Sequence, residues 1–140
     1  MNKIIPRFFR ISGYLMITNA IWMAASAHHW FVTIPADLVS TGEANGHFIH
    51  DVAAVYLTFG IALIWCASHL AKCFPVYLCA TGFMIAHALG HVFEILLGQL
   101  PHTHWWIDIP LVFLPAFILG ILALPVVWKR VVIFDNEGEI

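Results

Sequence analysis

The chain has 140 residues, of which 61% are hydrophobic and only 10% are charged, whereas charged residues make up about 25% of a typical soluble domain. One core in so short a chain cannot bury that much apolar surface, which disfavours a soluble domain and favours a single transmembrane domain over residues 1–140. The formal net charge is −2 and there is no basic run, so the electrostatic signature of a nucleic-acid-binding protein is missing.

Four continuous apolar runs follow one another along the chain, at about residues 8–27, 48–71, 74–98 and 109–128. Each run is close to the roughly 20 residues that a helix needs to cross the hydrocarbon core of a bilayer. A strand of a membrane barrel would instead alternate apolar and polar residues with a period of two. The sequence therefore predicts an all-α membrane protein, a bundle of four transmembrane helices.

The basic residues predict the orientation of this bundle. They precede or begin the first run, separate the second from the third and follow the fourth: Lys3, Arg7, Arg10, Lys72, Lys129 and Arg130. The other two loops contain no lysine or arginine, so all basic residues fall on one side of the bilayer. Because positive loops stay inside, we expect both termini to be cytoplasmic. The lipid bilayer is then the main partner, and other membrane subunits or a second copy are further candidates.

Histidine is unusually frequent: nine histidines outnumber the six lysines and arginines together. At the start of the second predicted helix, residues 45–51 read NGHFIHD. His47 lies three residues before His50 and four before Asp51, so the three side chains can share one helix face. Asn45 is expected to cap this helix or to support the face from the side.

The third predicted helix carries a second polar stripe, formed by His87, His91 and Glu94 at positions i, i+4 and i+7. Under the predicted topology both stripes lie in the outer half of the membrane, where ionisable groups are costly and normally face the bundle interior. Imidazole and carboxylate are ligands for transition metals. We therefore expect the two stripes to converge on a metal site made of His47, His50, Asp51, His87, His91 and Glu94.

The loop before the fourth helix holds further candidates. His102 and His104 are expected to be interfacial, with capping of the metal site from above as the alternative. Asp108 precedes Ile109 and Pro110, a pattern typical of a helix N-cap with proline in the first turn. A ligand or supporting role is the alternative for Asp108.

The chemistry of the site is open to several interpretations. The rich histidine supply favours copper or iron, with zinc as a further possibility, in a redox or metal-handling role; whether the protein is an enzyme stays open. One alternative is haem b, with His87 or His91 and His47 or His50 as axial ligands in electron transfer. Others are a non-catalytic accessory subunit of a larger membrane complex and a polar network without metal. Proton passage ranks last, because the inner half offers only His69.

Residues 45–51 and 87–94, which read NGHFIHD and HALGHVFE, resemble segments of a group of small bacterial four-helix inner-membrane proteins with no established function. These segments have the patterns N-x-H-F-x-x-D and H-x-x-x-H-x-x-[DE], and the resemblance covers most of the chain. It implies the fold and a location in the bacterial inner (plasma) membrane, and it implies no activity. The position of His50 is often arginine in this group, which implies that the other five residues of the two stripes are the stronger ligand candidates.

Overall fold

The computed structural model describes residues 4–136, and these form helices and turns without any strand. The helices in chain order are α1 (Ile4–Ala25), α2 (Ala27–Thr33), η1 (Leu38–Thr41), α3 (Gly46–Cys66), α4 (Phe74–Leu96), α5 (His104–Ile107), η2 (Ile109–Phe113), α6 (Leu114–Ala123) and α7 (Pro125–Asn136). Of these, η1 is a 3-10 helix and η2 is a π-helix. The all-α class is confirmed.

Two of the described helices, α3 and α4, are long and apolar enough to cross a membrane by length and composition. Helix α1 has a similar length of 22 residues, but it includes Arg7, Arg10 and Asn19. The fourth apolar run forms a shorter apolar helical stretch, Ile109–Ala123. Lys3 lies outside the described residues.

The connection between α3 and α4 is longer than the sequence pattern indicated. Helix α3 ends at Cys66 instead of near residue 71, because the next residues form tight turns. In these turns the N–H of His69 donates to the Cys66 carbonyl at 3.1 Å, and the N–H of Lys72 donates to the His69 carbonyl at 2.9 Å. Pro75 lies in the first turn of α4, where its missing N–H leaves no helix carbonyl unpaired.

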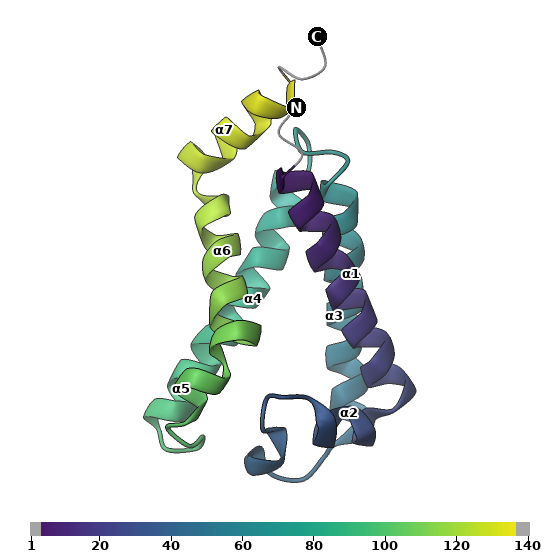
Figure 1. Ribbon diagram of the computed structural model, residues 1–140, viewed down its shortest axis with the longest axis vertical. Coiled ribbons are helices and arrows are strands. Elements are labelled where there is room, and N and C mark those ends of the chain that lie inside the picture. Colours follow the sequence, from purple (N-terminus) through teal and green to yellow (C-terminus); the bar gives the residue numbers. More distant parts are fainter. Residues whose placement is uncertain (1–3, 137–140) are drawn as a thin grey trace.

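Two prolines divide the fourth apolar run. Pro115 lies in the first turn of α6, directly after the π-helix η2, and proline has no N–H with which to complete a regular helical ladder. Leu124 has an extended backbone with ψ 129°, because a residue that precedes proline disfavours the helical conformation. Helix α7 consequently leaves α6 at an angle (Figure 1). The one helix predicted over residues 109–128 is thus divided among η2, α6 and α7.

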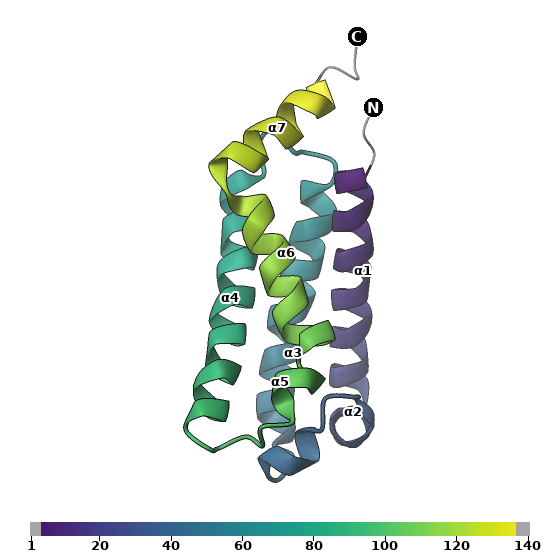
Figure 2. The ribbon, with the colours of Figure 1, turned by 60° about the vertical axis from the view of Figure 1, so that its left-hand side comes forward.

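The long helices pack as two pairs, α1 with α3 and α4 with α6 (Figures 1 and 2). The first pair is in backbone contact: a Cβ atom added to Gly13 would lie 2.6 Å from the Gly60 carbonyl oxygen, and one added to Gly60 would lie 2.8 Å from that of Gly13. Small residues permit this close approach, as they do in many membrane helix pairs.

An aromatic cluster joins the two pairs at the end of the molecule where α1 begins and α7 lies (Figure 1). The Tyr77 ring is 5.1 Å from that of Phe9 and 4.8 Å from that of Trp128, and Phe74 is 5.0 Å from Trp128. Tyr77, Phe9 and Trp128 are buried. We call this end, which also holds Lys72, the basic end, and the opposite end the histidine end.

Candidate metal centre

Three ionisable side chains meet at the histidine end of α4. The His91 Nδ1–H donates to Asp108 Oδ2 at 2.8 Å. Nδ1 of His104 lies 3.2 Å from the same oxygen and 3.4 Å from Oδ1. His104 and Asp108 are each only 1% exposed, and the His91 side chain is 18% exposed. Burying a carboxylate is costly unless it is hydrogen-bonded, and the two imidazoles meet that need.

Gly98 lets the chain return to His91 after α4 ends. Its φ of 72° is in the left-handed region, which glycine adopts without the steric penalty of a Cβ atom. The N–H groups of Gln99 and Leu100 then donate to the Glu94 carbonyl at 2.8 and 3.1 Å, closing the helix end. His104 and Asp108, at either end of α5, are four residues apart and therefore share a helical face.

Asp108 occupies the N-cap position of η2, as the sequence predicts, but its side chain does not cap the helix. Its side chain makes no cap hydrogen bond to η2, because its carboxylate oxygens are directed at His91 and His104. Only its backbone carbonyl takes part in the helix start, where it accepts from the N–H of Val112 at 2.8 Å and of Phe113 at 3.0 Å. The alternative interpretation of Asp108, as a ligand or supporting residue, is the one that its position favours.

The polar stripe of α3 is exposed and forms a local pair. Nε2 of His47 lies 3.7 Å from Asp51 Oδ2, with the two side chains 89% and 66% exposed, and His50 is exposed as well. Asn45 caps the helix, its Oδ1 accepting from the Phe48 N–H at 3.1 Å. The structure therefore does not bring the α3 stripe into the group around His91.

Only one residue of the α4 stripe belongs to the group formed with His104 and Asp108, and the other two lie outside it. The half-buried His87 ring is edge-on to His91 at 4.7 Å and parallel to Phe83 at 6.1 Å. Glu94 is exposed, and so is His102 in the turn before α5. Of the three residues of this stripe, His91 is the one that binds the buried carboxylate.

Within residues 4–136, His91, His104 and Asp108 are the one group of three or more potential metal ligands whose donor atoms all lie within 4.8 Å of one another. Two imidazoles and one carboxylate are a ligand set for non-haem iron(II) and for zinc. The sequence predicted His104 as an interfacial residue and Asp108 as a helix N-cap, with capping of the metal site and a ligand or supporting role as their respective alternatives. The signal that favours them is their spacing of four, the same as that of His47 and Asp51.

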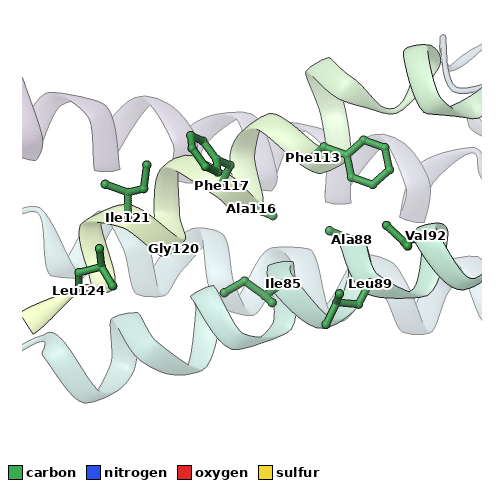
Figure 3. Close-up of a pocket in the computed structure, with 10 residues that line it drawn as sticks. All are labelled: Ile85, Ala88, Leu89, Val92, Phe113, Ala116, Phe117, Gly120, Ile121 and Leu124. Carbon is green, nitrogen blue, oxygen red and sulfur yellow. The ribbon is translucent and has the colours of Figure 1, made fainter.

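An apolar groove of about 390 Å³ runs between α4 and α6 (Figure 3). Its wall includes Ala88 and Val92, which lie three residues before and one residue after His91 in sequence, and Phe113, whose ring stacks on Trp105 at 6.0 Å. None of its lining residues is ionisable. The groove itself therefore offers no group for acid–base or ligand chemistry.

Comparison with known proteins adds no identity to this geometry. The chain matches no protein-family model, and it shows no significant similarity to a curated protein or to a solved structure.

Proposed function

We propose that this chain is an integral membrane protein that binds a transition-metal ion through His91, His104 and Asp108. The observation that carries the proposal is the buried Asp108 carboxylate, which has the two Nδ1 atoms 2.8 and 3.2 Å from one oxygen. Ligands that bind one metal at about 2.0–2.2 Å lie roughly 3 Å from each other. Each of the two nitrogens is therefore about as far from this oxygen as two ligands of one metal ion are from each other.

The ligand set favours iron(II), then zinc, then copper. Two imidazoles and one carboxylate, with coordination positions left open, are typical of non-haem iron(II) sites and also bind zinc. No cysteine belongs to the group, which disfavours Cu(I), an ion that selects soft sulfur ligands. This order differs from the one that the abundance of histidine suggested, and it supports a redox or metal-handling role.

The shared carboxylate also favours an ion over haem b. Axial imidazoles ligate haem iron from opposite faces of the porphyrin, whereas His91 and His104 turn towards the same acid. An absorption spectrum separates the two: a Soret band in the purified protein would favour haem.

We also propose that the chain crosses the bacterial inner membrane four times, with both termini in the cytoplasm. The positions of the basic residues support this topology. So does the exposure of large apolar side chains along the helices, including Ile11 and Leu15 on α1, Phe93 on α4 and Phe117 on α6, all 60% exposed or more. Such a surface is stable against lipid and unfavourable in water.

The fourth crossing is the short one. As a helix, Ile109–Ala123 would span roughly 22 Å at 1.5 Å per residue, against about 30 Å of hydrocarbon. The bilayer thins locally around this segment, or the residues after Leu124 complete the crossing.

The metal proposal is tested by elemental analysis of the full chain purified in mild detergent. We expect wild type to retain iron or zinc near stoichiometry, and His91→Ala and Asp108→Ala to lose it. Matched controls are His47→Ala and His102→Ala, which remove exposed residues at the same end of the molecule and should leave the metal content unchanged.

Two outcomes would contradict this assignment. Wild-type protein without metal above background, even after incubation with Fe²⁺ or Zn²⁺, would leave the group as a hydrogen-bonded network that fixes α5 to α4. Loss of metal in His47→Ala would move the site to the α3 stripe.

A further inference from the structure

A loop from the other helix pair reaches the candidate metal centre. Asp37 lies between α2 and η1, in the segment that connects α1 to α3. Its Oδ2 is 4.0 Å from Nε2 of His104, a residue that is 1% exposed and belongs to the segment after α4. This contact crosses between the two halves of the molecule at the histidine end.

The two nitrogens of the His104 ring thus face two different acids. Nδ1 is directed at Asp108 and Nε2 at Asp37. A histidine that binds a metal through one ring nitrogen almost always donates the N–H of the other to a carboxylate, carbonyl or water, which fixes its tautomer and orientation. We propose that Asp37 is the positioning residue of the metal centre: its carboxylate lies 4.0 Å from Nε2, an ion-pair distance longer than a hydrogen bond, and it closes to accept the Nε2–H when Nδ1 binds the ion. This inference rests on the proposed metal site.

The backbone of Asp37 supports the proposal independently of the ring geometry. Asp37 is the single non-glycine residue with positive φ in the described part of the chain, with φ 47° and ψ 42°. The left-handed region is unfavourable for residues that have a Cβ atom, and aspartate and asparagine tolerate it better than most. Glycine would hold the same turn without strain.

The backbone geometry provides a sharp test. Asp37→Gly removes the carboxylate but relieves the left-handed strain, and Asp37→Asn keeps both an acceptor and the tolerance of this conformation. Each variant of the full chain is titrated in detergent with Co²⁺ alone, whose visible absorption reports its coordination, and is then competed with Zn²⁺. Thermal unfolding is measured on the metal-free proteins. Glu43→Gln, an exposed acid of the same connection, is the control.

We expect Asp37→Gly to weaken metal binding roughly 10- to 100-fold and to change the Co²⁺ spectrum, while the metal-free protein unfolds at the same temperature as wild type or higher. Asp37→Asn should lie between Asp37→Gly and wild type in affinity, and Glu43→Gln should match wild type.

If wild type binds the ion and both Asp37 variants bind it equally well with an unchanged spectrum, the role of Asp37 is refuted and the metal site stands. If the variants lose thermal stability without metal but keep their affinity, Asp37 only anchors the loop. If wild type binds neither Co²⁺ nor Zn²⁺, the proposed function fails and this inference fails with it. Should Asp37→Gly not fold, the affinity and spectrum of Asp37→Asn decide.

Discussion

Asp108 is the acceptor that the buried His104 and the partly buried His91 share, and its own exposure of 1% leaves little room for water to replace either partner. Removing the carboxylate would leave the ring N–H groups of His91 and His104 without their acceptor. An unsatisfied buried donor costs about 1–3 kcal/mol. The group therefore contributes to stability even without a metal ion.

Asp108→Ala is expected to lower the free energy of unfolding of the metal-free protein by about 1–3 kcal/mol for each donor left unsatisfied. Asp108→Asn should cost less, because the amide oxygen keeps one acceptor. The measurement is denaturant unfolding in detergent, followed by circular dichroism. The control Asp51→Ala removes an acid that is 66% exposed and should change stability little. Equal stability of the two alanine variants would contradict the structural part played by Asp108.

At this scale the sequence could indicate candidates but not their partners. The spacing of four between His87 and His91, or between His104 and Asp108, shows which residues share a helical face. It does not show which face packs on which neighbour. The packing partner of each face depends on the turn at Gly98 and on the segment that follows it. The sequence pattern therefore grouped His91 with the stripe of α3, whereas its partners in the structure, His104 and Asp108, lie later in the chain.

Among the elements, α1 and α3 make the closest contact, because Gly13 and Gly60 bring the two backbones together. Gly82 on α4 makes no such contact, because a Cβ atom added to it would meet nothing within 4 Å. A glycine in a helix indicates backbone contact only where another backbone faces it.

Alanine at these glycines should therefore have opposite effects. Gly13→Ala or Gly60→Ala is expected to destabilise the chain by about 1–3 kcal/mol through overpacking, because the new methyl would collide with a carbonyl oxygen. Gly82→Ala should be neutral, or stabilising by about 0.5–1 kcal/mol, because alanine is the better helix former. Thermal unfolding in detergent compares the three. Loss of stability in Gly82→Ala alone would reverse the assignment of the helix contact.

The long helices were predictable, and so were the ends of α4, whereas the end of α3 was not. Continuous apolar runs identify α1, α3 and α4 because hydrophobicity persists over their whole length. The turns after Cys66 still contain Ala67, Leu70 and Ala71, so the hydropathy pattern extended the predicted helix beyond its true end. The short helices α2 and α5 depend on local turns and tertiary contacts, which a hydropathy pattern does not register.

The two ends of the molecule differ in character: one end carries the basic residues and the other carries the candidate metal centre. This asymmetry follows from the positions of Arg7, Lys72 and Lys129 relative to His91. If the basic end is cytoplasmic, the metal centre lies near the outer surface of the inner membrane.

Cysteine labelling in spheroplasts tests this orientation. In a variant whose native Cys66, Cys73 and Cys79 are replaced by serine, Glu43→Cys should react with a membrane-impermeant maleimide. Lys129→Cys should react only after the membrane is permeabilised. Labelling of Lys129→Cys in sealed spheroplasts would invert the topology or remove a crossing, and mass spectrometry of the chain reads out the result.

The turn at Gly98 has a consequence for biosynthesis. His91 emerges from the ribosome before His104 and Asp108, so α4 of a membrane-inserted chain would enter the bilayer while its imidazole still lacks the acid that will hold it. Under the proposed topology these later residues reach the far side only when the last apolar run has inserted. Metal loading would then follow membrane insertion, with the ion drawn from the periplasm and not from the cytoplasmic pool.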